Sequence, residues 1–262
     1  GDHPGPSPVI SRGADVLDIS DTFPTMSELL NTESIESKMD DINGTKIGVI
    51  DSLLENSAWH SQDKKHPYLL APVDLQAVKA CGVTFAQSML ERVIEERAKG
   101  DPSAARGIRD DIQKVIGLDL ESIIPGSSEA EQLKEVLIKK GMWSQYLEVG
   151  IGPDAEVFTK AQPMSVMGIG AQIGILEKSE WNNPEPEIVL AVNSLGAVKG
   201  ATLGNDVNLR DVEGRSALLL GKAKDNNASS AIGPFIRLFD DGYGIDDVRR
   251  AELELEVTGE DG

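Results

Sequence analysis

The 262-residue sequence has few of the side chains on which several classes of protein depend. Its single cysteine, Cys81, excludes an internal disulfide and is typical of a reducing cytoplasm. Only three histidines are present, and none is placed for a Ser-His-Asp triad. No apolar stretch approaches the roughly 20 residues of a membrane-spanning helix, and the polar start at residues 1–8 is unlike a secretory signal. We therefore expect a cytoplasmic protein that does not associate with membranes.

Basic residues are also scarce, because 25 lysines and arginines stand against 44 acidic residues and give a net charge of −19. A surface of this sign repels nucleic acid and anionic membranes, so neither is expected as a partner. A small anionic substrate would then need a local positive centre, such as a metal ion or a pair of basic side chains. The hydrophobic share of 40% is sufficient for a substantial core.

The segment 181–234 contains the most informative pattern in the chain. Residues 188–192 are apolar and rich in branched side chains, as expected of a buried strand. Asn193, Ser194 and Gly196 favour a turn, and residues 197–203 return as a second strand. The pattern therefore predicts a β-hairpin.

Three acidic residues lie at the open end of this hairpin. Glu185 and Glu187 are two residues apart, so in an extended chain their side chains point to one face. The returning strand brings Asp206 back towards them. Three such carboxylates repel one another unless a cation lies between them, and an all-oxygen ligand set suits Mg²⁺ first and Mn²⁺ or Ca²⁺ next. The alternative is a solvated acidic rim with Asp206 in a turn, and the spacing alone leaves both open.

The sequence motifs of this segment resemble those of a known family. Glu185-x-Glu187, the stretch GNDVNLRD and a lysine nine residues before Gly233-Pro234 are similar to the fumarylacetoacetate hydrolase family. The segments WNNPEPEIVL and AKDNNASSAIGP are most similar to those of its 2-keto-3-deoxy-pentonate (arabinonate/xylonate) dehydratases. The resemblance covers about residues 75–262.

This resemblance implies a mainly β (α+β) fold, a mixed β-sandwich or roll with a helical flap. It divides the chain into a small N-terminal α+β module, residues 1–74, and a catalytic domain, residues 75–262. Family members continue through further strands, so we expect the sequence to be C-terminally incomplete. A homo-oligomer, a dimer or tetramer, is also implied.

The family's site residues map onto this sequence one by one. The resemblance implies Mg²⁺ on Glu185, Glu187 and Asp206, with Asp206 also near the substrate, and Arg210 supporting a bound 2-oxo acid. Lys224 matches the family lysine by its spacing to Gly233. Lys222 instead matches the family's Gly-Lys dipeptide, because Gly221 precedes it. We favour Lys224 as the base and expect the cation and burial to lower its pKa. An exposed surface ammonium is the alternative for either lysine.

The resemblance also reaches a helix predicted near residues 84–98. The hydrolytic members carry a His–Glu pair there that activates water, and here Ser88 and Glu91 occupy those positions. Serine cannot replace imidazole as a base, which argues against attack of water on a C–C bond. Glu91 is left as a lone acid/base, or as an ordinary surface glutamate. Phe158-Thr159-Lys160 resembles the family's Phe-x-Lys at a strand edge.

Local patterns predict several further elements. A short helix is expected over 25–30, another over 101–116, and a third over 128–141 after a capping box. Residues 143–159 alternate in a way that favours strands, and alternation over 251–257 predicts a half-exposed strand.

Three functions follow as hypotheses. The first is a Mg²⁺-dependent dehydratase that converts a 2-keto-3-deoxy-pentonate to 2-oxoglutarate semialdehyde. The second is a C–C hydrolase of an acylpyruvate or diketo acid on the same scaffold. The third is a non-catalytic acidic binding module.

A thermal melt separates the enzyme hypotheses from the third. Mg²⁺ together with oxalate or pyruvate should raise the melting temperature if the native state binds them, because such ligands stabilise the folded form. An unchanged melting temperature over millimolar additions would favour the binding-module hypothesis.

Overall fold

The computed structural model describes residues 5–82, 107 and 123–259. Its contacts divide the chain into two compact units, one formed by residues 1–78 with 159–262 and the other by residues 79–158. The chain therefore leaves the first unit close to the predicted division after Asp74. That division itself stays a prediction, since residues 1–78 share a unit with the C-terminal part.

The first unit begins with a three-stranded antiparallel sheet of order β1-β2-β3. Strands β1 (Val9–Arg12) and β2 (Asp15–Asp18) join through a tight turn in which Gly13 has a φ of +61°, a value that favours glycine. β3 (Thr45–Val49) pairs with β2 and leads into α3 (Ile50–Ser57).

Short helices connect β2 to β3. They are α1 (Met26–Asn31), α2 (Ile35–Lys38) and the 3₁₀ helix η1 (Met39–Asp41). Thr25 caps α1, because its Oγ1 accepts a hydrogen bond from the backbone N–H of Glu28 at 3.0 Å. The helix predicted over 25–30 is therefore confirmed.

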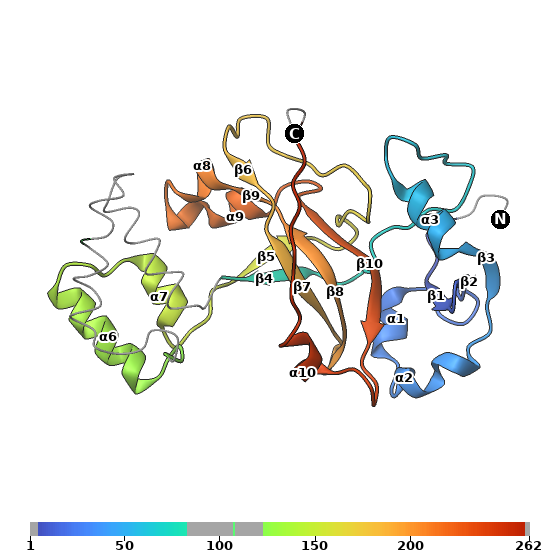
Figure 1. Ribbon diagram of the computed structural model, residues 1–262, viewed down its shortest axis with the longest axis horizontal. Coiled ribbons are helices and arrows are strands. Elements are labelled where there is room, and N and C mark those ends of the chain that lie inside the picture. Colours follow the sequence, from blue (N-terminus) through green and yellow to red (C-terminus); the bar gives the residue numbers. More distant parts are fainter. Residues whose placement is uncertain (1–4, 83–106, 108–122, 260–262) are drawn as a thin grey trace. The chain divides into compact units, whose positions relative to one another are not determined.

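The second sheet of this unit carries the hairpin predicted from the sequence. β7 (Pro186–Val192) and β8 (Val198–Asp206) are antiparallel, and β10 (Ser230–Leu238) pairs with the other edge of β8 (Figure 1). Asn193 Oδ1 closes the turn by accepting hydrogen bonds from the backbone N–H groups of Leu195 and Ala197. Gly196 supplies the positive φ of +79° that the turn needs.

Smaller elements flank both ends of this sheet, with α10 (Ile245–Val248) at the end nearer the hairpin turn (Figure 1). The two-stranded pair β6 (Asn182–Asn183) and β9 (Asn208–Leu209) is antiparallel. The helices α8 (Arg210–Glu213), η3 (Ala217–Leu219) and α9 (Leu220–Lys224) follow β9, and α10 follows β10. The core cluster around α8 and α9 contains Leu209, Val212 and Ala223.

The N-terminal sheet and the hairpin sheet belong to one packed unit. A buried cluster that includes Ile10, Leu29 and Ile35 has Leu238 of β10 packed against it. Lys199 of β8 pairs with Glu36 at 3.0 Å. These contacts fix the sheet whose open end carries the predicted site.

The second unit, residues 79–158, contains α6 (Ser128–Lys139) and α7 (Gln145–Ile151). The predicted helix over 128–141 is confirmed with a small shift, since Ser127 is the cap and accepts from Ala130 N at 3.2 Å. A two-stranded sheet forms where the chain enters and leaves this unit, from β4 (Val78–Cys81) and β5 (Val157–Ala161).

Two sequence predictions are wrong. Much of the segment predicted as strands over 143–159 is the helix α7, because Leu147 and Ile151 are both buried and four residues apart, which matches one helix face. Residues 251–257 form no strand in the structure and are exposed. Their alternation is suitable for a strand, but among the described residues no neighbouring strand supplies the hydrogen-bonding partner that a strand requires. The helices predicted over 84–98 and 101–116 lie outside the described residues, apart from Gly107.

In the part of the chain that the structure describes, no helix combines the length and the apolar composition needed to cross a bilayer.

The N-terminal core offers a direct test of this packing. Ile35 is fully buried, so an Ile35→Ala variant should lower the free energy of unfolding by about 2–5 kcal/mol. Leu195, which is 89% exposed in the hairpin turn, is the matched control, and Leu195→Ala should change stability by less than about 0.5 kcal/mol. Urea titrations of the two variants measure the difference, and equal midpoints would contradict the packing described.

Candidate functional site

The pairing of β7 with β8 brings the acidic residues together. Pro186 is the register partner of Asn205, so Glu185 and Asp206 are adjacent at the end of the ladder, and Asp206 N donates to Glu185 O at 2.9 Å. Glu187 faces Gly204 across the same ladder. The hairpin therefore brings Glu185 next to Asp206, with Glu187 two residues further along β7.

An ammonium group lies between two of the carboxylates. Lys224, the last residue of α9, donates to Glu185 Oε2 at 2.5 Å and to Asp206 Oδ2 at 3.0 Å. Its side chain is 4% exposed, whereas Lys222 on the same helix is exposed. Of the two lysines that the sequence left open, the structure therefore brings Lys224 to the carboxylates.

A second lysine, Lys160 of β5, approaches Asp206 from the other side. Its side chain is 1% exposed, and its Nζ lies 3.0 Å from Asp206 Oδ1. The same Nζ donates to the backbone carbonyls of Val207 and Lys224 and lies 3.4 Å from Ser229 Oγ. Lys160 was not among the predicted site residues. Two sequence features could have identified it: Lys160 lies in an otherwise apolar strand, and it is the lysine of the Phe-x-Lys motif.

Asn208 is a further site residue that the sequence did not single out. It begins β9 and is 1% exposed. Its Nδ2 donates to Glu185 Oε1 at 3.1 Å and to Glu213 Oε2 at 2.6 Å. Its position two residues after Asp206 was the available signal, because alternate residues of an extended chain share a face.

The charges in this cluster shift three pKa values. Burial lowers the pKa of Lys160, and the positive charge of Lys224 acts in the same direction against the attraction of Asp206. Burial of its carboxyl group, together with the negative charges of Asp206 and Glu185, raises the pKa of Glu187.

The sequence predicts a lowered pKa for Lys224, and the structure gives the opposite direction. Burial lowers its pKa, but the charges of Asp206 and Glu185 and the hydrogen bonds to them outweigh burial. The net effect raises the pKa above its ordinary value, because the ammonium itself acts as the cation of the cluster.

The cluster has the donors that a hard cation requires, but the arrangement is not a ready-made metal site. Among residues 5–82, 107 and 123–259, no group of three Asp, Glu, His or Cys side chains is arranged to hold an ion. Within the cluster, Asn208 Oδ1 is buried and makes no hydrogen bond, whereas Asp206 Oδ1 lies 3.0 Å from Lys160 Nζ in an ion pair. A buried acceptor without a partner is costly and calls for one, and an all-oxygen set suits Mg²⁺. The donor types present therefore fit the ion, although the Lys224 ammonium lies between Glu185 and Asp206 in the structure.

The remaining predicted residues are not part of this cluster as described. Arg210 Nε donates to Asn183 Oδ1 at 3.2 Å, and its guanidinium lies 5.9 Å from the ring centre of Trp181. Its role towards a substrate stays a prediction. Ser88 and Glu91 lie outside the described residues.

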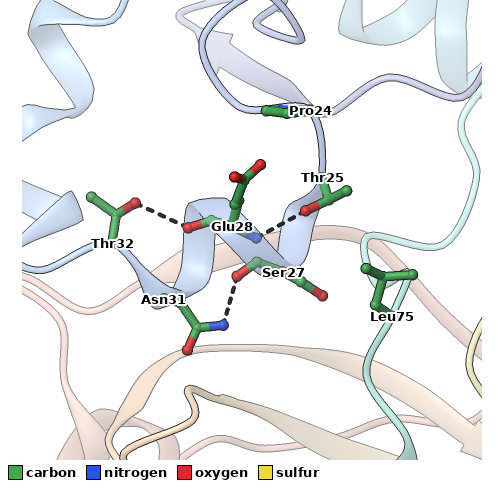
Figure 2. Close-up of a pocket in the computed structure, with 7 residues that line it drawn as sticks. All are labelled: Pro24, Thr25, Ser27, Glu28, Asn31, Thr32 and Leu75. Atoms are coloured by element: carbon green, nitrogen blue, oxygen red, sulfur yellow. Dashed lines mark hydrogen bonds between the residues drawn. The ribbon is translucent and has the colours of Figure 1, made fainter.

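A pocket elsewhere in the first unit contains none of these residues. It is a shallow, open groove beside α1 (Figure 2). Its lining residues are Pro24, Thr25, Ser27, Glu28, Asn31, Thr32 and Leu75. Figure 2 shows that Thr25, Asn31 and Thr32 use their side chains in hydrogen bonds to α1 itself. These groups stabilise the helix, so the carboxylate–lysine cluster is the stronger candidate site.

Comparisons with known proteins point to one group of enzymes. No family model matches the sequence. The chain is 35% identical over 129 residues to a protein named probable 2-keto-3-deoxyxylonate dehydratase from Haloferax volcanii, covering 49% of this chain and 42% of that protein. It is 38% identical over 81 residues to 2-dehydro-3-deoxy-D-arabinonate dehydratase from Saccharolobus solfataricus, covering 31% and 27%. The matches thus span less than half of these relatives.

Solved structures show the same fold. The chain matches 2-keto-3-deoxy-D-arabinonate dehydratase complexed with magnesium and 2,5-dioxopentanoate with a TM-score of 0.53 at 19% identity. Its apo form matches with a TM-score of 0.54 at 20% identity. Each match covers 88% of this chain and 64% of the solved one. The mainly β, α+β class is consistent with these neighbours, whereas membership of the fumarylacetoacetate hydrolase family stays a prediction.

The buried lysine of this cluster can be tested by its effect on stability. Lys160→Met removes one partner of a buried ion pair and the donor to two carbonyls, so the free energy of unfolding should fall by about 3–5 kcal/mol. Lys222→Met, on the exposed side of α9, should change it by less than about 0.5 kcal/mol. Guanidinium titrations give both values, and similar losses in the two variants would argue against the described role of Lys160.

Proposed function

We propose that this protein is a Mg²⁺-dependent hydro-lyase that dehydrates a 2-keto-3-deoxy-pentonate to 2-oxoglutarate semialdehyde. The observation that carries the proposal is the cluster of Glu185, Asp206 and Lys224, in which two carboxylates share one buried ammonium. The similarity to proteins named as dehydratases of this substrate class supports it. So does the fold of a dehydratase that was solved with magnesium and 2,5-dioxopentanoate.

The proposed ligands of the ion are Glu185, Glu187 and Asp206. When bound, Mg²⁺ supplies an electrophile that polarises the 2-keto group, acidifies the C3 proton and neutralises the carboxylates. Burial of the Glu187 carboxyl group, together with the negative charges of Asp206 and Glu185, raises its pKa, and a bound cation would favour its ionised form.

Lys224 is the proposed base towards C3. An ammonium cannot accept a proton, so this role requires the neutral amine, and the carboxylates of Glu185 and Asp206 oppose that form in the described structure. Neutralisation of those carboxylates is therefore a condition of the mechanism. Lys160 holds Asp206 and the carbonyl of Lys224, so we assign it to positioning these two residues.

The reaction balances as the loss of one water molecule. A proton leaves C3 and the C4 hydroxyl leaves with a proton, which gives a C3=C4 double bond. Loss of a proton from C5 and return of a proton to C3 then give the C4=C5 enol, and tautomerisation of this enol to the C5 aldehyde gives the semialdehyde. We propose Glu91 as the group that assists departure of the hydroxyl, with Ser88 and Arg210 in contact with the 2-oxo acid. A homo-oligomer and a cytoplasmic location remain expectations of the sequence.

Turnover of candidate substrates tests the proposal. Purified protein should release 2-oxoglutarate semialdehyde, detected with a coupled semialdehyde dehydrogenase, only when Mg²⁺ is present. Glu187→Ala and Lys224→Met should each lower kcat/KM by at least about 100-fold, since both remove groups of the reacting centre. Lys222→Met, an exposed lysine two residues away, should retain the parent rate.

Other results would overturn parts of this function. Full turnover by Glu187→Ala would rule out Glu187 as a metal ligand. Release of pyruvate from an acylpyruvate, without dehydration of the sugar acid, would indicate the C–C hydrolase instead.

A further inference from the structure

Asn208 is buried in the candidate site, and the orientation of its amide is fixed by its neighbours. Its Nδ2 donates to one carboxylate oxygen of Glu185 and to one of Glu213. The reversed amide would direct its carbonyl oxygen at both carboxylates, where three acceptors would face one another without a proton. The nitrogen therefore faces the two acids, and Oδ1 faces away from them.

The two oxygens of Glu185 are held from different sides. Lys224 bonds Oε2 and Asn208 bonds Oε1, so the carboxyl group has a single orientation in the cluster. Of the two donors, the amide of Asn208 carries no charge. It can therefore hold Glu185 whether or not another cation replaces the Lys224 ammonium.

The carbonyl oxygen of Asn208 lacks a hydrogen-bond partner. Asp206 Oδ1, by contrast, is ion-paired with Lys160 Nζ at 3.0 Å. Both residues contact the Glu185–Lys224 pair, Asn208 through Glu185 and Asp206 through Lys224. A buried acceptor without a hydrogen bond beside a pair of carboxylates points to a ligand that brings positive charge or N–H and O–H donors.

We propose that Asn208 is a positioning residue that holds the Glu185 carboxylate for a hydrated divalent cation. The inference rests on the proposed function for the identity of the ligand. The hydrogen bond from Asn208 to Glu185 stands independently of it and has its own measurement.

The hydrogen bond is measured first, on the full chain without added metal. Asparagine labelled with ¹⁵N gives one side-chain NH₂ signal pair for each residue, and the pair that is absent in Asn208→Asp belongs to Asn208. Its protons should resonate downfield and exchange slowly, and Glu185→Gln should shift them more than any other asparagine pair. Fast exchange and no response to Glu185→Gln would overturn the positioning role.

Cation binding is measured next, by electron paramagnetic resonance during titration with Mn²⁺. Asn208→Ala and the isosteric Asn208→Asp should both weaken Mn²⁺ binding by at least 10-fold. The weakening in Asn208→Asp is diagnostic, because an added negative charge without a positioning role would strengthen cation binding. Asn193→Asp is the control, since it adds the same charge at the hairpin turn and keeps its oxygen acceptor. Its affinity should stay within about twofold of the parent.

The outcomes separate the two proposals. Parent-like or tighter Mn²⁺ binding by a folded Asn208→Asp, verified by its melting curve, would overturn the role of Asn208. Absence of Mn²⁺ binding by the parent chain would overturn the cation in the proposed function and here, while the NMR result would still decide whether Asn208 holds Glu185.

Discussion

The candidate site depends on one pairing of strands. The register of β7 with β8 puts Glu185 beside Asp206, and a shift by one residue would turn every side chain of β7 to the opposite face. The pairing is fixed at the other end by the turn that Asn193 and Gly196 close. The open end carries the acids, so the position of the carboxylates is set by contacts along the whole hairpin rather than by the site alone.

Opposite charges then stabilise what the hairpin brings together. Lys224 and Lys160 approach the two oxygens of Asp206, and the pKa values of these lysines shift in opposite directions. Lys224 has two carboxylate partners, which outweigh its burial, whereas Lys160 donates mainly to neutral carbonyls and stays dominated by burial. The same low-dielectric surroundings therefore favour the charged form of one ammonium and disfavour that of the other.

Much of this arrangement could be predicted from the sequence, for identifiable reasons. The hairpin has a strong apolar pattern and a turn of Asn, Ser and Gly, so its strands and the meeting of Glu185 with Asp206 follow from local rules. The choice of Lys224 over Lys222 rested on spacing to Gly233, and the structure brings Lys224 to the acids.

What could not be predicted depends on contacts between distant residues. The local sequence marks Lys160 as a lysine in an apolar strand and Asn208 as a near neighbour of Asp206, but it does not identify the distant groups that each side chain contacts. The helix α7 replaced expected strands because burial selected the four-residue spacing of Leu147 and Ile151 over their alternation. The rise in the pKa of Lys224 likewise follows from its position between two acids, which spacing alone does not give.

The contacts of Lys160 have a consequence for how the centre assembles. One ammonium joins strand β5 to the carbonyls of residues that lie 47 and 64 positions further along the chain. Closing loops of that size is slow and lowers the entropy of the chain before any contact stabilises it. An isolated peptide of the hairpin would therefore hold the acids but none of the positive charge that balances them. The complete cluster therefore exists only when β5, the residues after β8 and the end of α9 are in place together.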